Sequence, residues 1–346
     1  MIFKTILRPL LFNCDAETAH RFTINALAFA PVLDAPVFDP VLRITVAGLD
    51  FASPVGLAAG FDKDAEVWRE MLGLGFGFVE VGSITPRPQV GNLKPRLFRL
   101  IEDEGVINRM GFNNRGHDAA VARLAGRMHG QRTGIVGVNL GANKDSEDRI
   151  ADYATGVRTF APLADYLAIN ISSPNTPGLR GLQQGDALAD LLDAVADARG
   201  PSGPPIFLKL APDLSSAELD DVAKAIAGKV DALIMGNTTL SRNGLASRHR
   251  DEGGGLSGKP LGTIARAALI DLRKATGGGI PIVAAGGIDS AEEAYARIRM
   301  GASLIQIYSA MVYHGPGMAR SIADRLAGLL KRDGFAALSD AVGIDD

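Results

Sequence analysis

The stretch from Asn170 to Arg180, NISSPNTPGLR, carries serine, asparagine and threonine side chains that could do chemistry. It follows an apolar run, Tyr166 to Ile169, which is typical of a short buried strand. Two prolines, a glycine and two asparagines disfavour both helix and strand, so the segment is predicted to be a shaped loop. A rigid polar loop after a buried strand is where α/β proteins place catalytic groups. The same residues would also suit an ordinary turn.

The overall composition narrows the classes of function. The chain has 346 residues and a formal net charge of −3, so it lacks the basic excess typical of nucleic-acid-binding proteins. Its single cysteine, Cys14, excludes an intramolecular disulfide and favours a reducing compartment. The 5 histidines are scattered without metal-ligand spacing, so no metal site is predicted. No apolar run approaches the roughly 20 residues of a membrane-spanning helix.

The N-terminal segment is predicted to form two amphipathic helices. Apolar residues within 3–11 recur at helical spacing, with two basic residues beside them. Asp15 is a suitable cap for a second helix over 16–30. Such a helical hairpin suits either a membrane surface or packing on the main domain, and both interpretations stay open. We therefore divide the chain into a membrane-associating segment, 1–40, and a main domain, 41–346.

The main domain alternates short apolar runs with helical patterns. The predicted strands are Val55–Ala59, Phe76–Val81, Ile135–Leu140, Tyr166–Ile171, Ile206–Leu210, Ala232–Met235, Ile282–Ala285 and Leu304–Tyr308. The predicted helices between them include Ala65–Leu74, Asn114–Met128, Glu147–Phe160, Ala187–Ala198, Ala217–Ala227, Thr263–Lys274 and Ala291–Met300. Eight such repeats predict a (β/α)8 TIM barrel. A doubly wound open sheet is the alternative, but it usually has fewer strands, and no GxGxxG fingerprint follows an early strand here.

Each predicted strand ends in a polar residue or glycine, and in a barrel these ends meet at one mouth. Asparagine, threonine, serine and glycine dominate there, with Lys63 and Lys209 as the lysines, which suits an uncharged heterocycle. Gly286-Gly287 follows the seventh strand and Tyr308-Ser309 the eighth, where barrels commonly bind phosphate. These features predict a phosphorylated planar cofactor, and FMN fits best. Lys209 would stabilise negative charge on a reduced flavin, or else be a satisfied lysine of the barrel core.

Several long motifs occur in a fixed order along nearly the whole chain. They are DAETAHRF (15–22), FDKD (61–64), GSITPRPQVGNLKPRLFRL (82–100), INRMGFNN (107–114), NISSPNTPGLR (170–180), NTT (237–239) and GGLSGKPL (254–261). This set resembles the dihydroorotate dehydrogenase family, and within it the membrane-associated, quinone-dependent class 2. The resemblance implies oxidation of (S)-dihydroorotate to orotate in de novo pyrimidine (UMP) biosynthesis. It also implies FMN as hydride acceptor and ubiquinone or menaquinone as final electron acceptor.

The resemblance further implies roles for individual residues. Ser173 falls where class 2 enzymes keep a serine base, whereas soluble class 1 enzymes use a cysteine there. The residues implied to hold FMN are Ala59, Gly60, Lys63, Ser83, Asn139, Asn170, Lys209, Gly236, Gly258, Gly287, Tyr308 and Ser309. Those implied to hold substrate are Lys63, Asn108, Arg109, Met110, Gly111, Phe112, Asn170, Asn175, Asn237 and Thr238. Two positions depart from the family pattern: Gly236 replaces a hydroxyl residue, and Ser83 replaces the usual threonine.

The expected mechanism begins with Ser173, which removes a proton from the ring carbon beside a carbonyl while a hydride leaves the neighbouring carbon. Thr176 and a water could relay the proton. No CxxC-rich pattern or NAD fingerprint is present in the sequence, so electrons need an acceptor that comes to the flavin. The N-terminal hairpin offers an apolar route for a quinone, and the resemblance implies that His20, Arg99 and Tyr308 line it. We expect a monomer bound peripherally at the cytoplasmic face of the cell inner membrane.

Three alternatives remain at this point. The first is a soluble class 1-like enzyme that uses fumarate or NAD, against which Ser173 and the N-terminal hairpin argue. The second is another FMN-barrel oxidoreductase that acts on a different pyrimidine or on tRNA uridine, although the near-neutral charge argues against RNA. The third is a non-enzymatic membrane-bound barrel whose flavin dihydroorotate does not bleach.

Overall fold

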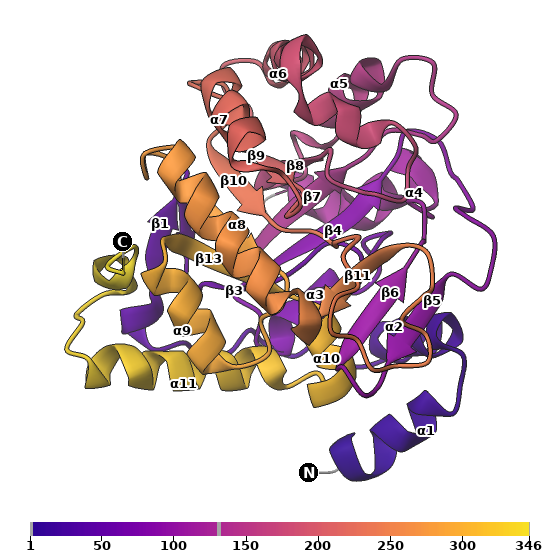
Figure 1. Cartoon of the computed structure of the whole chain (residues 1–346), viewed down its shortest axis with the longest axis vertical. Helices are drawn as coiled ribbons and strands as arrows, with labels where there is room; N and C mark the ends of the chain where they lie inside the picture. Colours follow the sequence, from indigo (N-terminus) through magenta and orange to yellow (C-terminus); the bar gives the residue numbers. More distant parts are fainter. Residues whose placement is uncertain (1–2, 130–132, 346) are drawn as a thin grey trace.

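The computed structural model describes residues 3–129 and 133–345, so parts of both predicted segments, at 1–2, 130–132 and 346, lie outside it. A closed barrel of parallel strands forms the centre of the molecule, and helices surround it (Figure 1). In barrel order the strands are β10 (Ala232–Met235), β12 (Ile282–Ala285), β13 (Ala302–Ile307), β3 (Val55–Leu57), β4 (Phe78–Ile84), β7 (Ile135–Leu140), β8 (Tyr166–Asn170) and β9 (Ile206–Leu210). Each of the eight overlaps a predicted strand, with bounds that differ by up to three residues, so the TIM-barrel prediction is confirmed.

Helices cover the outside of the barrel, and all but the last two, which were not predicted, lie close to their predicted positions. They are α3 (Trp68–Gly73), α4 (Gly116–Leu124), α5 (Arg149–Phe160), α6 (Gly185–Arg199), α7 (Ser216–Ala225), α8 (Gly262–Ala275), α9 (Ala291–Arg299), α10 (Ser309–His314) and α11 (Met318–Arg332). The helix predicted from Ala65 begins only at Trp68, because the Asp62 carboxylate accepts hydrogen bonds from the Glu66 and Val67 amides in a preceding turn. The helix predicted to reach Met128 ends as α4 at Leu124 and continues as a 3-10 turn.

Aromatic rings fill the interior of the barrel at its lower end. Tyr166 and Phe207 stack with their ring centroids 4.3 Å apart, and Phe51 closes the floor against Phe78 at 5.1 Å. These rings are fully or almost fully buried. Gly56 leaves the space that the Phe78 ring occupies, since a Cβ there would lie 2.2 Å from it. The barrel is therefore filled by side chains at the amino ends of its strands. Ligands can enter at the carboxyl ends of the strands.

Two small antiparallel sheets were not predicted. A hairpin of β1 (Ile44–Val46) and β2 (Leu49–Phe51) precedes the barrel and supplies part of its floor. A second sheet joins β5 (Leu97–Leu100), β6 (Gly105–Asn108) and β11 (Gly255–Gly258). It brings the loop that follows β4 together with the loop that follows β10, so both are anchored beside the mouth of the barrel (Figure 1).

The N-terminal segment is helical, as predicted. A π-helical turn (Phe3–Leu7) leads into α1 (Arg8–Phe12), and α2 (Ala16–Ala28) follows. Asp15 caps α2, because its carboxylate accepts a hydrogen bond of 2.9 Å from the Thr18 amide. Among the described residues, no helix has the length and apolar character needed to cross a membrane.

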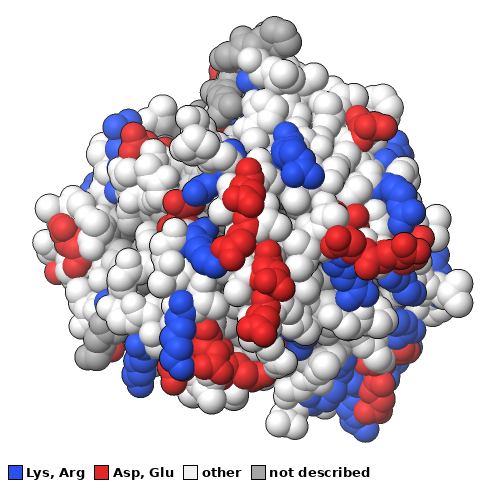
Figure 2. Space-filling view, turned by 90° about the horizontal axis from the view of Figure 1, so that it is seen from above, with Lys and Arg blue, Asp and Glu red and all other residues white. Residues whose placement is uncertain are grey.

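The face seen from above Figure 1 carries charges of both signs (Figure 2). Acidic and basic side chains are interspersed on it, with uncharged areas between them. On this face neither sign of charge dominates, in keeping with the formal net charge of −3.

Stability is expected to fall between pH 6.5 and about 4 because of His117 in α4. Its ring packs edge-on against Phe160 at 5.1 Å, and burial lowers the pKa of His117 to about 4. The unfolded chain binds a proton at this histidine at a higher pH than the folded chain does. The free energy of unfolding is therefore undiminished above pH 6.5 and decreases as the pH falls below it. The expected loss is on the order of 2 kcal/mol.

The measurement is urea unfolding at pH 7 and pH 5 for the wild type and for His117→Leu, which cannot titrate. The variant should lose less stability over this interval than the wild type. Equal losses would show that His117 is not responsible.

Candidate active site

One cavity of about 930 Å³ opens at the carboxyl ends of the barrel strands and continues beneath α1 and α2. Most of the site residues predicted from the sequence line this cavity. From the cofactor set these are Ala59, Gly60, Lys63, Ser83, Asn170, Lys209, Gly236, Gly258, Gly287, Tyr308 and Ser309. The others are Asn108, Met110, Gly111, Phe112, Ser173, Asn175, Asn237, Thr238, His20 and Arg99.

Three predicted residues do not line the cavity. Asn139 and Thr176 are buried behind its wall. The Arg109 side chain turns away, because its Nη1 donates to Glu252 Oε2 at 2.9 Å and its guanidinium lies 4.6 Å from the centre of the Phe98 ring. Arg109 therefore helps to fix the edge of the small sheet, and its guanidinium does not reach the cavity.

A chain of amide and hydroxyl groups crosses the barrel below the cavity. The Ser83 hydroxyl donates to Asn139 Oδ1. Asn170 Nδ2 donates to Ser83 Oγ at 2.9 Å and to Asn139 Oδ1 at 3.1 Å. These three side chains come from the ends of neighbouring strands β4, β7 and β8, and each fixes the orientation of the next. The Ser83 hydroxyl thus has a structural partner, as the usual threonine would.

This chain of hydrogen bonds ends at the carboxylate of Glu80, a residue that was not predicted as part of the site. Its carboxylate, which is completely buried in β4, accepts hydrogen bonds from Asn139 Nδ2 at 2.7 Å, Tyr166 Oη at 2.9 Å and Gln306 Nε2 at 2.7 Å. Lys209 Nζ lies 3.7 Å from it and gives it an ionic partner. The signal in the sequence was an acidic residue that interrupts an apolar strand.

Hydrogen bonds between neighbouring loops hold the serine pair in the loop after β8. Ser172 Oγ donates to Asn170 Oδ1 at 2.7 Å and accepts a hydrogen bond from Asn237 Nδ2 at 2.8 Å. Among the described residues, Ser173 Oγ accepts only one hydrogen bond, a long one of 3.3 Å from the Asn175 amide, and Ser173 lines the cavity. Ser172 therefore positions the loop, while the Ser173 hydroxyl donates no hydrogen bond to any group in the described part of the chain.

The same loop is tied down from outside the cavity. Arg180 Nε donates to the Ser172 carbonyl at 2.9 Å, and its Nη2 donates to the Thr238 carbonyl at 3.1 Å. Asn175 Nδ2 donates to the Asn108 carbonyl at 3.1 Å. The loops after β4, β8 and β10 are thus linked to one another, which preorganises the cavity wall.

Lys63 brings a positive charge into a desolvated part of the cavity. Its Nζ donates to the Gly60 carbonyl at 2.7 Å. Burial lowers the pKa of Lys63 to about 8, and the nearby acidic residues Glu17 and Asp64 act against that decrease. The ammonium group is therefore charged at neutral pH and can attract a carboxylate.

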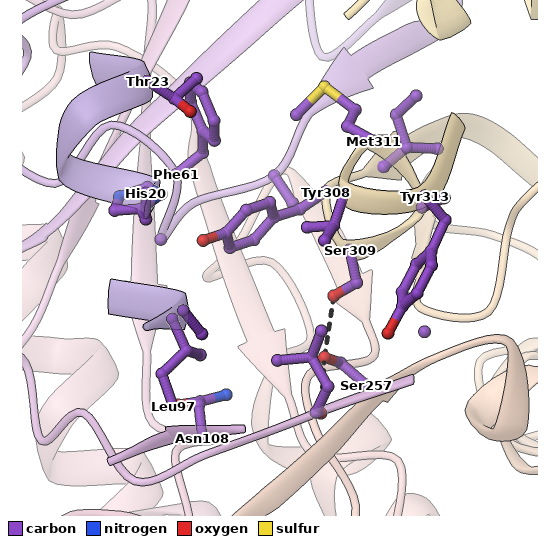
Figure 3. A pocket seen from close by; sticks show the side chains of 18 of the residues that line it. His20, Thr23, Phe61, Leu97, Asn108, Ser257, Tyr308, Ser309, Met311 and Tyr313 are labelled. Atoms are coloured by element: carbon purple, nitrogen blue, oxygen red, sulfur yellow. Dashed lines mark hydrogen bonds between the residues drawn. The ribbon is translucent and has the colours of Figure 1, made fainter. Parts of the chain in front are cut away.

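Close backbone approaches shape the far end of the cavity. Gly236 has a φ of +117°, and a Cβ there would lie 2.1 Å from the Ala285 carbonyl oxygen, so this backbone leaves no space for a side chain. Ser309 begins α10 and is joined to Ser257 by a hydrogen bond of 2.8 Å between the hydroxyls (Figure 3). At this end, exposed peptide groups and hydroxyls replace bulky side chains.

Aromatic side chains form the part of the cavity beneath α2. The His20 ring meets Phe61 edge-on at 5.4 Å and lies 6.3 Å from the Tyr308 ring (Figure 3). Burial, with smaller effects from the positive charges of Lys63 and Arg21, lowers the pKa of His20 to about 3. His20 is therefore neutral at physiological pH. Burial also raises the pKa of Tyr308, so its hydroxyl stays protonated.

Arg99 holds the N-terminal helices over this part of the cavity. Its Nη2 donates to the Cys14 carbonyl at 2.8 Å, and its guanidinium lies 4.8 Å from the centre of the Phe12 ring. Phe12 also packs edge-on against Tyr313 at 5.7 Å. Arg99 thus contacts the connection between α1 and α2 as well as lining the cavity.

Two ion pairs fasten α2 to the barrel. Arg96 binds Glu17 through two hydrogen bonds of 2.7 and 3.0 Å, and both side chains are largely buried. One turn further along α2, Arg21 also forms a bidentate ion pair, in which its two Nη atoms donate to the two carboxylate oxygens of Glu66. Because bidentate pairs fix direction as well as distance, α2 has a defined orientation above the cavity.

Comparison with known proteins identifies relatives of nearly full length. The family model described as dihydroorotate dehydrogenase matches residues 41–330. The chain is 58% identical over 344 residues to the dihydroorotate dehydrogenase (quinone) of Erythrobacter litoralis, covering 99% of each chain. It is also 58% identical to the protein of that name from Novosphingobium aromaticivorans, with 98% of each chain covered.

A solved structure agrees with these sequence relatives. The crystal structure of the Eimeria tenella DHODH in complex with ferulenol superposes with a TM-score of 0.90, at 42% sequence identity and with 95% of each chain covered. The similarity therefore includes the N-terminal region as well as the barrel.

Proposed function

This chain belongs to the dihydroorotate dehydrogenase family, and we propose that it oxidises dihydroorotate to orotate with FMN and a membrane quinone, in pyrimidine biosynthesis. The observation that carries this proposal is the continuity of one cavity. The same cavity is lined by Ser173 at the barrel mouth and by His20 of α2. A single space can therefore receive the substrate from one side of a flavin and a quinone from the other.

The residues of the cavity fit FMN. Its volume of about 930 Å³ lies in the range of ligand-binding cavities. Lys209 supplies a buried donor for a polar ring, and the close backbone approach at Gly236 leaves room beside it. The glycines and hydroxyls near Gly287 and Ser309 suit a phosphate. A bound FMN would supply the acceptor for a hydride.

Ser173 is the proposed base. Ser173 lines the cavity, and its hydroxyl accepts the long hydrogen bond from the Asn175 amide. Its oxygen would take the proton from the substrate ring carbon while its own hydroxyl proton passes to a water and the buried Thr176, which act as the relay. Asn175, Asn237 and Thr238 offer amide and hydroxyl groups to the imide and urea-like edges of the ring. Lys63 is the proposed partner of the carboxylate.

The affinity for orotate is expected to fall above pH 8, because Lys63 loses its charge there. In the free protein the pKa of Lys63 is about 8, so the lysine is protonated below that pH. The affinity for the orotate carboxylate is therefore highest below pH 8 and decreases as the pH rises through it. Titration of the oxidised protein with orotate from pH 6.5 to 9.5 measures this. Lys63→Gln should bind weakly throughout and show a much smaller pH dependence. A wild-type affinity that does not change with pH would contradict the assignment.

The quinone is proposed to enter beneath α1 and α2. His20, Arg99 and Tyr308 line this part of the cavity, together with apolar side chains such as Leu11 and Phe22. Neutral His20 and protonated Tyr308 can offer hydrogen bonds to quinone oxygens without a buried charge. Steady-state dihydroorotate oxidation with a soluble quinone, with fumarate and with NAD tests the acceptor. Only the quinone should support turnover, and comparable rates with fumarate or NAD would overturn this part of the proposal.

Peripheral binding to the cytoplasmic face of the inner membrane is proposed through the N-terminal helices. Leu10 and Phe22 are 60% and 65% exposed, and Phe29 is 92% exposed beyond α2. A monomer suffices, since one chain supplies all the lining residues described above.

The double replacement Leu10→Glu, Phe22→Glu is expected to prevent flotation of the protein with phospholipid vesicles. The matched control is Ile344→Glu, which alters an exposed apolar side chain near the C-terminus. If the double variant floated as well as this control, membrane binding would have to occur elsewhere.

A further inference from the structure

Arg297 is a completely buried arginine in α9 that lies against two loops of the barrel mouth. Its Nη2 donates to the Gly262 carbonyl at 2.9 Å and to the Gly286 carbonyl at 3.3 Å. Its Nε donates to Glu293 Oε1 at 2.7 Å. One guanidinium group thus joins the start of α8 to the loop after β12.

The two loops that Arg297 joins are packed backbone against backbone. A Cβ on Gly287 would lie 2.3 Å from Gly262 Cα, so only glycine permits this approach. Gly286 and Gly287 line the cavity at its glycine-rich end. Arg297 therefore acts on the backbone of the cavity wall from the side opposite to the ligand.

Because peptide groups are planar, the contact of Arg297 with these carbonyls also fixes the orientation of the N–H groups next to them. In a trans peptide the C=O of one residue and the N–H of the next point in opposite directions. Because Arg297 holds the Gly286 carbonyl, it fixes the opposite direction for the Gly287 N–H. It does the same for the Gly262 carbonyl and the following N–H in the first turn of α8. Peptide N–H groups of this kind are the usual ligands of phosphate in barrels.

The charge around Arg297 is not fully neutralised. Glu293 is shared between Arg297 and Arg266, which leaves one positive charge in excess within this group of three. Nη1 of Arg297 has no hydrogen-bond partner within the part of the chain that the structure describes. A buried positive charge directly behind a backbone loop favours an anion in front of it.

We propose that Arg297 is a positioning residue for the phosphate group of the flavin cofactor. It holds the Gly262 and Gly286 carbonyls, directs the adjoining N–H groups toward the phosphate, and adds a positive charge behind them. The inference rests on the proposed function, because it requires FMN at this end of the cavity.

The test compares FMN with riboflavin, which has the same ring but no phosphate. The full chain, freed of flavin, is titrated with each compound by fluorescence. Arg297→Met is expected to lose roughly 10- to 100-fold in FMN affinity, while its riboflavin affinity stays within about twofold of the wild type. Arg297→Lys keeps the charge, so its FMN affinity should lie between those of the wild type and Arg297→Met.

Arg266→Met is the matched control, because Arg266 binds the same Glu293 and contacts neither carbonyl held by Arg297 in the described hydrogen bonds. It should lose much less FMN affinity than Arg297→Met, because both carbonyls stay held and the charge that it removes is about half exposed to solvent. Its riboflavin affinity should match that of the wild type. Circular dichroism confirms folding, and Arg297→Lys carries the comparison if Arg297→Met does not fold. Equal losses for FMN and riboflavin, or no loss for either, would overturn the inference. A wild-type protein that fails to bind FMN would overturn the proposed function itself.

Discussion

Replacing Ser173 with alanine is expected to slow flavin reduction by dihydroorotate by roughly 10²- to 10⁴-fold, while FMN remains bound. The reason is that Ser173 Oγ is the proposed base, and the main hydrogen bonds of the loop are made by Ser172 and Asn170 instead. Rapid mixing of the oxidised protein with dihydroorotate under anaerobic conditions measures the rate. Ser173→Cys should retain part of the activity, since a cysteine thiolate can also accept the proton.

Ser172→Ala provides the matched comparison for this prediction. The Ser172 hydroxyl joins Asn170 to Asn237, so its loss should disturb the groups that hold the substrate and raise KM more than it lowers kcat. Ser173→Ala should show the opposite pattern. An unchanged reduction rate in Ser173→Ala would exclude this serine as the base.

Replacing Glu80 with glutamine is expected to cost about 3–5 kcal/mol in the free energy of unfolding. The buried carboxylate accepts three hydrogen bonds and faces Lys209, so an amide removes the charge and turns a donor toward other donors. Urea unfolding of the FMN-loaded protein measures the change.

Glu292→Gln is the control for Glu80→Gln. Glu292 also pairs with an arginine, but its side chain is 60% exposed, and such pairs contribute at most about 1 kcal/mol. If both variants unfolded at the same urea concentration, the carboxylate at the centre of the barrel would not have the role assigned to it.

The barrel and the N-terminal helices could be predicted because their signals are local. Each barrel strand is an apolar run of a few residues, and Asp15 caps α2 within one turn of itself. The sheet of β5, β6 and β11 could not be predicted in the same way. Its strands are short, and Asn108 pairs with Gly255, which is far away in the sequence. Pairing of this kind leaves no periodic pattern within either segment.

The site shows the same division between local and distant signals. Ser173 and Asn170 could be assigned because polar residues after barrel strands converge at the mouth. The partners of Glu80 and Arg297 could not, since a buried charge is satisfied by whichever groups the fold brings to it. Gln306, for example, is 226 residues from Glu80 in the sequence. A charge inside an apolar strand signals an unknown partner and does not identify it.

We propose that this protein oxidises dihydroorotate and passes the electrons to a quinone within one cavity. The absorption spectrum of the purified protein tests this most directly. The spectrum is recorded without oxygen before and after dihydroorotate is added, and again after a soluble quinone is added. We predict that a yellow, FMN-containing protein is bleached by dihydroorotate and recovers its colour with the quinone. A bound flavin that dihydroorotate does not bleach would contradict the proposed reaction, even though the barrel and its cavity would stand.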